Sequence, residues 1–111
     1  MYSITVSGHF DAAHRLPGVE ICERLHGHSF QVECKVSSET LNDQGMVIDF
    51  RKIKGVWKQY DHRYLNDVFE MPTAENIAME IFHQVKMAVA PALVEYVRVW
   101  ESPDAYAEVR Q

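Results

Sequence analysis

Two stretches of alternating side chains constrain the fold of this chain most strongly. In residues 2–12 apolar side chains recur at every second position, and residues 26–37 repeat the alternation with Phe30, Val32, Cys34 and Val36. Successive side chains of a β-strand point to opposite faces of a sheet, so each stretch is typical of a half-buried strand. The residues between them contain Pro17-Gly18, which favours a long loop. The sequence therefore predicts two strands early in the chain.

The rest of the chain predicts two helices and then two more strands. Residues 50–60 carry apolar side chains at helical spacing after Asp49, a suitable N-cap, and residues 71–89 do so with Thr73 as the cap. Segments 94–101 and 106–110 predict strands around a turn at residues 102–104. This order predicts an α+β fold, an antiparallel four-stranded sheet with two helices on one face. Its uncovered edges predict self-association.

Length and composition limit the classes of protein. The chain has 111 residues and a net charge of −5, which suits a single domain spanning residues 1–111. No basic block occurs, so nucleic-acid binding is not expected. No secretion signal or long apolar run is visible, so we expect no membrane segment and a cytoplasmic location. In that compartment Cys22 and Cys34 are expected to be two separate thiols, although a disulfide between them stays open.

Three histidines share the inward parity of the first two predicted strands. His26 and His28 continue the register of Phe30, and His14 continues that of residues 2–12. If the two strands pair antiparallel, the three imidazoles approach one point, which is a zinc site with one open position. The alternative is chance, because an H-x-H pattern is common. His83 lies on the second predicted helix and is expected to be an ordinary surface histidine.

Further polar residues suit proton transfer or ligand binding. Cys22 precedes the histidines, where a metal and Arg24 would stabilise a thiolate, whereas Cys34 faces the core. Asp61 and His62 form an acid–imidazole pair, or belong to a polar loop after the helix. Glu101 shares the inward parity of the last long strand. It either binds a ligand with two adjacent N–H donors, as guanine-like heterocycles have, or lies exposed at the strand end.

The sequence resembles the family of 6-pyruvoyltetrahydropterin and 6-carboxytetrahydropterin synthases. The matching segments occur in the family's order and span nearly the whole chain: FDAAHRLP, CERLHGHSF, GMVIDF, YDHRYLND, MPTAEN and VRVWESP. The resemblance implies the tunnelling fold, in which sheets of several subunits join into a barrel. It also implies a homo-oligomer built on trimers, as in a hexamer, or a tetramer, with active sites between subunits.

The resemblance also implies a set of site residues. Zn²⁺ would be held by three histidines: His14, His26 and His28. Proton transfer would involve Cys22, Asp61 and His62. Glu101 would anchor the ring of a pterin substrate, with help from the Thr73 region. Many relatives have a second hydroxyl residue after this threonine, but here Ala74 follows, which puts a side-chain contact from that position in doubt.

Three reactions share this set of residues. The one we expect converts 7,8-dihydroneopterin triphosphate to 6-carboxytetrahydropterin in queuosine synthesis. The alternatives are elimination to 6-pyruvoyltetrahydropterin, or an aldolase-type cleavage to 6-hydroxymethyldihydropterin for folate synthesis. In the family the last class has a glutamate in place of the catalytic cysteine or beside it, and here Glu23 lies beside Cys22. A zinc- and pterin-binding module without turnover is the alternative outside enzymes.

Overall fold

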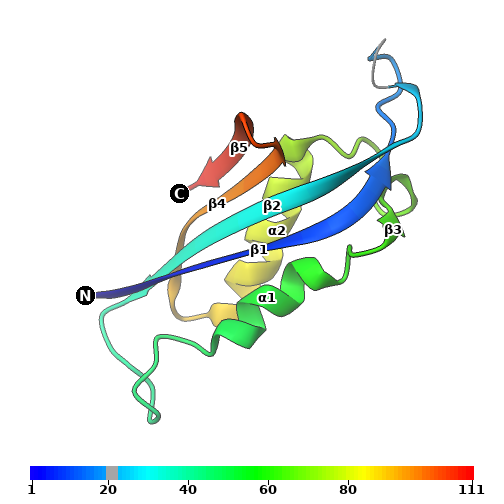
Figure 1. The fold of residues 1–111 in the computed structure, drawn as a ribbon. Helices are drawn as coiled ribbons and strands as arrows, with labels where there is room; N and C mark the ends of the chain where they lie inside the picture. Colours follow the sequence, from blue (N-terminus) through cyan, green and yellow to red (C-terminus); the bar gives the residue numbers. More distant parts are fainter. Residues whose placement is uncertain (20–22) are drawn as a thin grey trace.

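Two long paired strands run along the length of the molecule. The computed structural model describes residues 1–19 and 23–111, and in it β1 (Tyr2–His14) pairs antiparallel with β2 (His26–Ser38) along their whole lengths. Thirteen residues at about 3.3 Å each span roughly 43 Å, so this ribbon sets the long axis of a molecule that measures 49 × 23 × 23 Å (Figure 1). The two strands predicted from the alternation are confirmed, each slightly longer than expected.

The sheet has five strands, not the four predicted. β4 (Leu93–Ser102) and β5 (Ala105–Arg110) form the expected hairpin, and the order across the sheet is β3-β1-β2-β4-β5. The additional strand is β3 (Arg63–Tyr64), which pairs parallel with Ala12 and Ala13 of β1. The sheet is therefore mixed, and the fully antiparallel prediction is wrong. Two residues are too few to show a period-two pattern, so β3 has no signal in the sequence.

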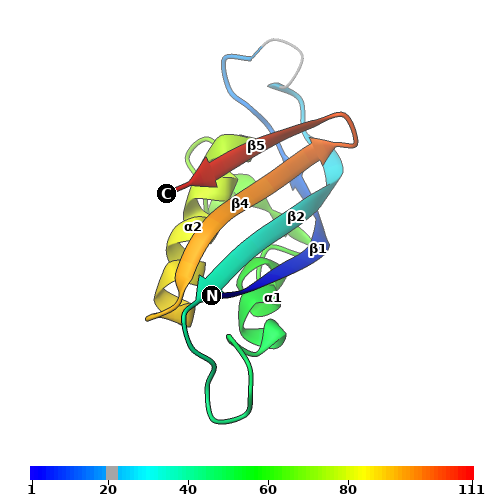
Figure 2. The ribbon, with the colours of Figure 1, turned by 90° about the vertical axis from the view of Figure 1, so that its left-hand side faces the viewer.

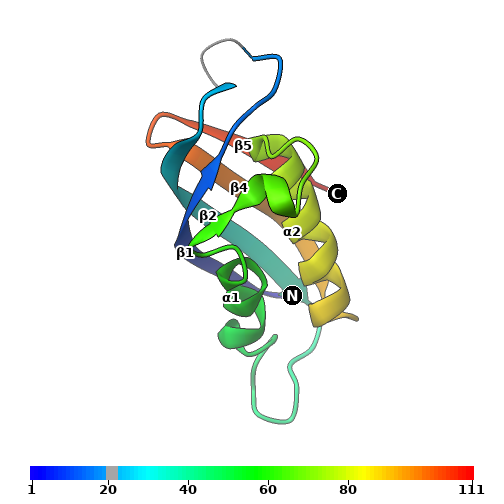
Figure 3. The same ribbon diagram turned by 90° about the vertical axis from the view of Figure 1, so that its right-hand side faces the viewer.

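Two helices cover one face of this sheet, as predicted. α1 (Phe50–Lys58) begins at Asp49, whose side chain accepts a hydrogen bond from the Arg51 backbone N–H, and α2 (Ala74–Val89) begins at Thr73 in the same manner. Figure 2 shows the strands in front of the helices, and Figure 3 shows the helices on the near side. Between these layers lie the largest buried side chains, with Phe10 and Phe30 stacked at 5.0 Å.

The opposite face of the sheet carries polar and aromatic side chains. Arg98 on this face bonds to Glu33 and Glu108 and lies over the Tyr96 ring.

The joining of subunits into a barrel stays a prediction. The longer helix, α2, has 16 residues, and no helix in the described part of the chain combines the length and apolar character that crossing a membrane requires.

Candidate metal centre

The three histidines lie where β1 ends and β2 begins. His14 and His26 are direct partners in the ladder, and His28 lies opposite Ala12. Directly opposed residues, and residues two apart on one strand, point to the same face, here the face that the helices cover. The imidazole centroids are 4.6 Å (His14–His26), 5.1 Å (His14–His28) and 4.7 Å (His26–His28) apart. The strand register therefore brings all three rings together.

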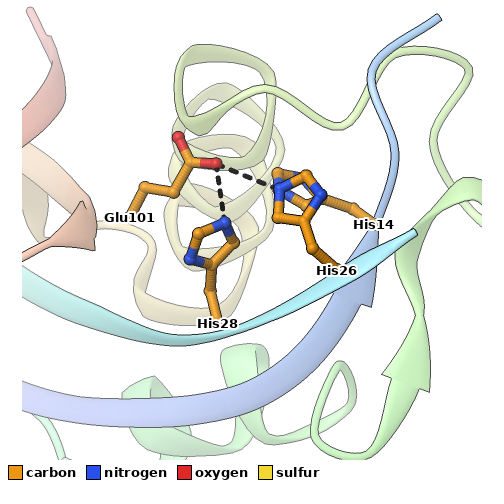
Figure 4. Close-up of side chains that lie close together, drawn as sticks. All are labelled: His14, His26, His28 and Glu101. Atoms are coloured by element: carbon orange, nitrogen blue, oxygen red, sulfur yellow. Dashed lines mark ion pairs between the residues drawn. The ribbon is translucent and has the colours of Figure 1, made fainter. Parts of the chain in front are cut away.

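Glu101 completes this cluster from β4. It shares the parity of the fully buried Val97 and Val99, so its side chain faces the histidines. Its Oε1 atom lies 3.0 Å from Nε2 of His14 and 3.2 Å from Nε2 of His28 (Figure 4). Each of the four residues contributes a ligand atom within 4.8 Å of the others. The cluster thus joins three strands, β1, β2 and β4.

Backbone carbonyls place a hydrogen on Nδ1 of two of the rings. His14 donates from Nδ1 to the Pro72 carbonyl at 2.8 Å, and His26 donates from Nδ1 to the Arg24 carbonyl at 2.7 Å. A carbonyl oxygen only accepts, so each Nδ1 carries the hydrogen, and in a neutral ring Nε2 then presents a lone pair. A hydrogen bond from the other ring nitrogen to a carbonyl is typical of histidines that ligate metals, because it orients the ring.

The arrangement around His14 fits a bound cation. His14 is fully buried, and in the neutral ring its Nε2 lone pair faces the Glu101 oxygen, which is also an acceptor. Among the described residues, Nε2 of His14 and of His28 lack a hydrogen-bond partner of proper geometry. Burial lowers the pKa of His28, and the neighbouring His14 and His26 lower it further, while Glu101 raises it. Neutral imidazoles are the form that binds metal ions, so the donor set fits a divalent metal.

A large cavity adjoins the cluster. It has a volume of about 750 Å³, which suits a ligand the size of a bicyclic heterocycle with a short side chain. His26, His28 and Glu101 lie on its wall, and other lining residues include Arg24, Glu75 and Tyr106. A ligand in this cavity would therefore contact the cluster of histidines and Glu101, with the basic side chain of Arg24 near it.

Asp61 and His62 lie outside the four-residue cluster. His62 Nδ1 is 3.2 Å from Asp61 Oδ2, and the imidazole is 82% exposed. The Asp11 N–H donates to Asp61 and holds the pKa of this carboxyl below its usual range. His62 has a positive φ of 58°, which is unusual for a residue with a side chain, and its N–H donates to the Asp11 carbonyl at 2.6 Å. His62 and His28 line a common surface hollow.

The remaining predicted residues have different surroundings. The Thr73 hydroxyl accepts from the Asn76 N–H as the α2 cap, and the preceding residue supplies the carbonyl that holds His14. Cys22 lies outside the described residues, whereas its neighbour Glu23 is exposed. Cys34 is a buried free thiol, and burial raises its pKa to about 12, as expected for an unreactive core cysteine.

Asn66 supports the end of β1 next to His14, a role that reasoning from the sequence missed. Its side-chain oxygen accepts from the Arg15 N–H and its amide donates to the Arg15 carbonyl, both at 2.9 Å. The amide thus continues the β1 ladder one residue beyond His14. Asn66 belongs to η2 (Leu65–Asp67), within the motif that also carries Asp61 and His62. The motif is visible in the sequence, but a bond between residues 51 positions apart has no signature in local spacing.

Comparison with known proteins identifies the family. Residues 3–111 match the sequence model of 6-pyruvoyl tetrahydropterin synthase. The chain belongs to this family. A 6-carboxy-5,6,7,8-tetrahydropterin synthase of Synechocystis is 41% identical over 115 residues, covering 91% of this chain and 89% of the relative. The dihydroneopterin monophosphate aldolase of Pyrococcus furiosus is 40% identical over 106 residues, with 90% of each chain covered.

The fold comparison agrees with the family assignment. The structure of 6-pyruvoyl tetrahydropterin synthase from Caenorhabditis elegans superposes with a TM-score of 0.81 and 26% identity, covering 99% of this chain and 95% of that one. The resemblance seen in the sequence is therefore confirmed at the level of the family, and the histidine cluster lies within the matched region.

Proposed function

We propose that this protein is a zinc-dependent 6-carboxy-5,6,7,8-tetrahydropterin synthase of queuosine biosynthesis. The reaction converts 7,8-dihydroneopterin triphosphate and water to 6-carboxytetrahydropterin, acetaldehyde and triphosphate. The observation that carries the proposal is the cluster of three imidazoles and one carboxylate beside a cavity of about 750 Å³. The Synechocystis relative, named as a synthase of this kind, supports the choice of reaction.

The metal would be held by His14, His26 and His28. Three imidazoles with a further open position are the donor set of catalytic zinc, and the carbonyls of Pro72 and Arg24 orient two of the rings. When bound, Zn²⁺ supplies Lewis acidity to oxygens of the substrate side chain, which makes removal of a neighbouring proton easier. The protein's part is to hold the imidazoles in fixed positions, which the burial of His14 and its bond to the Pro72 carbonyl favour.

Other residues would bind the ring and move protons. Glu101 would accept two N–H donors of the pterin ring, which places the side chain of the substrate beside the histidines. Thr73 stands at the start of α2, next to the cavity wall at Ala74. Cys22, as a thiolate, would take a proton from the substrate side chain. His62, oriented by Asp61 at 3.2 Å, would exchange a proton on the other side.

A second reaction has support from two observations. The Pyrococcus furiosus relative, named a dihydroneopterin monophosphate aldolase, is almost as similar as the synthase from Synechocystis. Glu23 beside Cys22 is the sequence feature that the family resemblance associates with the aldolase-type class. The alternative proposal is therefore cleavage of the dihydroneopterin side chain to 6-hydroxymethyl-7,8-dihydropterin.

Product analysis distinguishes these reactions. Purified zinc-loaded protein is incubated separately with dihydroneopterin triphosphate, dihydroneopterin monophosphate and dihydroneopterin, and the products are identified by mass spectrometry. We expect 6-carboxytetrahydropterin and acetaldehyde from the triphosphate. Hydroxymethyldihydropterin would establish the aldolase, 6-pyruvoyltetrahydropterin would establish elimination, and unchanged substrate in all three reactions would contradict an enzyme of this family's chemistry.

Variants test the roles of individual residues. Cys22→Ala is expected to abolish turnover and to keep zinc and pterin binding, whereas His26→Ala is expected to lose the metal. His83→Ala is the matched control, because this exposed histidine of α2 lies outside the cluster. Normal turnover by Cys22→Ala would contradict the proton-transfer role, and full zinc occupancy in His26→Ala would contradict the ligand role.

A further inference from the structure

The Glu101 carboxylate takes the fourth corner of the histidine cluster. Its Oε1 lies 3.0 and 3.2 Å from the Nε2 atoms of His14 and His28. Ligand atoms at the corners of a tetrahedron around zinc, at bond lengths of about 2.0–2.1 Å, are roughly 3.3 Å apart. The distances from Glu101 to the two imidazoles are therefore close to those between atoms that share one small cation.

We propose that Glu101 is a ligand of the metal while no pterin is bound, and that it leaves the metal to bind the pterin ring. This inference rests on the proposed function, because it takes the substrate to be a pterin anchored by Glu101. It extends that function by adding an exchange of partners at Glu101. The Glu101 carboxylate occupies the fourth position of the metal in the resting protein and leaves that position open only when the pterin ring is bound.

The surroundings of Glu101 permit such an exchange. Its side chain is 32% exposed and lies on the wall of the large cavity, whereas its Oε1 faces the histidines. The β4–β5 register shifts between Trp100 and Ser102, so Glu101 stands at an irregularity in the ladder near the end of β4. A partly exposed glutamate has several accessible side-chain rotamers. Rotation about the side-chain bonds of Glu101 would carry its carboxylate away from the metal and toward the cavity.

The two roles compete for the same oxygen. A carboxylate that accepts two parallel N–H donors uses both of its oxygens. Oε1 is the atom that faces His14 and His28, so binding of the ring withdraws it from the metal. Linkage requires the effect to be reciprocal: the metal weakens binding of the ring by the same factor by which the ring weakens binding of the metal.

Unsubstituted pterin, 2-amino-4-oxopteridine, is the probe for this coupling. It presents the two N–H donors and lacks the side-chain hydroxyls of the substrate. We expect zinc-free protein to bind this pterin at least about fivefold more tightly than zinc-loaded protein. Fluorescence titration measures the pterin affinity, and competition with a chromophoric chelator measures the zinc affinity with and without pterin. Equal pterin affinities, or tighter binding with zinc, would overturn the exchange.

A pair of variants tests the ligand role without any pterin. Glu101→Gln is expected to lower the zinc affinity at least about tenfold, because a neutral amide is a much weaker ligand. Glu75→Gln is the control, because Glu75 lines the same cavity but lies outside the cluster. The zinc affinity of this variant should equal that of the wild type. The absorption spectrum of the Co²⁺-substituted wild type gives an independent readout, which should change when pterin is added.

The outcomes separate this inference from the proposed function. If Glu101→Gln keeps the zinc affinity but loses pterin binding, the ligand role is wrong and the anchoring role stands. If the wild type binds no pterin, the proposed function and the exchange both fail, while the zinc measurement still decides whether Glu101 is a ligand. A Co²⁺ spectrum that pterin leaves unchanged, in protein shown to bind pterin, also overturns the exchange.

Discussion

Replacing Asn66 by alanine should lower both the free energy of unfolding and the zinc affinity of the protein. The Asn66 side chain makes two hydrogen bonds of 2.9 Å with the backbone of Arg15, the residue after His14. Each neutral hydrogen bond contributes about 1 kcal/mol net, and water replaces part of this at a partly exposed position, so we expect a loss of about 1–2 kcal/mol. Urea denaturation followed by tryptophan fluorescence measures it.

The effect on the metal follows from the position of His14. Without the Asn66 amide, the end of β1 loses two hydrogen bonds to Arg15, which extend the β1–β3 pairing by one step. We expect zinc affinity to fall by up to about tenfold, the lower end of the loss typical for a residue that bonds a metal ligand directly, because Asn66 bonds the backbone beside His14 and not its ring. Chelator competition measures this affinity in the same preparations.

Asn42→Ala is the matched control. Its side-chain oxygen also accepts two backbone hydrogen bonds, from Gln44 and Met46, but in the loop before α1. It should lower stability by a comparable amount and leave zinc affinity unchanged. If Asn66→Ala and Asn42→Ala have the same zinc affinity, the support of His14 by Asn66 is refuted.

Three further predictions follow from the packing and the charges. A Cβ on Gly8 would lie 2.8 Å from Nε1 of the buried Trp57, whereas one on Gly55 of α1 would meet nothing within 4 Å. Gly8→Ala should therefore cost about 1–3 kcal/mol, and Gly55→Ala should stabilise by about 0.5–1 kcal/mol in the same urea assay. The Asp61 carboxylate has a lowered pKa in the fold, so its stabilisation is present above the unfolded pKa and is lost as the pH falls through the folded one. Asp61→Asn should thus have a lower urea midpoint than the wild type near pH 7 and the same midpoint at acidic pH. Equal midpoints of the two proteins at both pH values would contradict this. Cys34, with its pKa of about 12, should resist a thiol reagent at pH 8 in folded Cys22→Ala protein and react after denaturation.

The sequence alone determined the features that depend on local periodicity. Alternation placed β1 and β2, and the same parity assigned His14, His26 and His28 to one face of the sheet. Asp49 and Thr73 marked the starts of the helices, because an N-cap needs only a side-chain acceptor two or three residues before the bonded N–H. These signals lie within a few residues of one another, and a single sequence displays them directly.

Only the tertiary structure decided what joins distant segments. It added β3, whose two residues carry no periodic pattern, and it placed Asn66 against Arg15 and the Pro72 carbonyl against His14. It also brought Glu101 within 3.2 Å of two imidazoles, where parity had shown only that this side chain faces inward. Residues far apart in the chain meet because the sheet and the helices pack on one core. Such packing depends on the whole set of apolar contacts, so no local stretch of sequence encodes it.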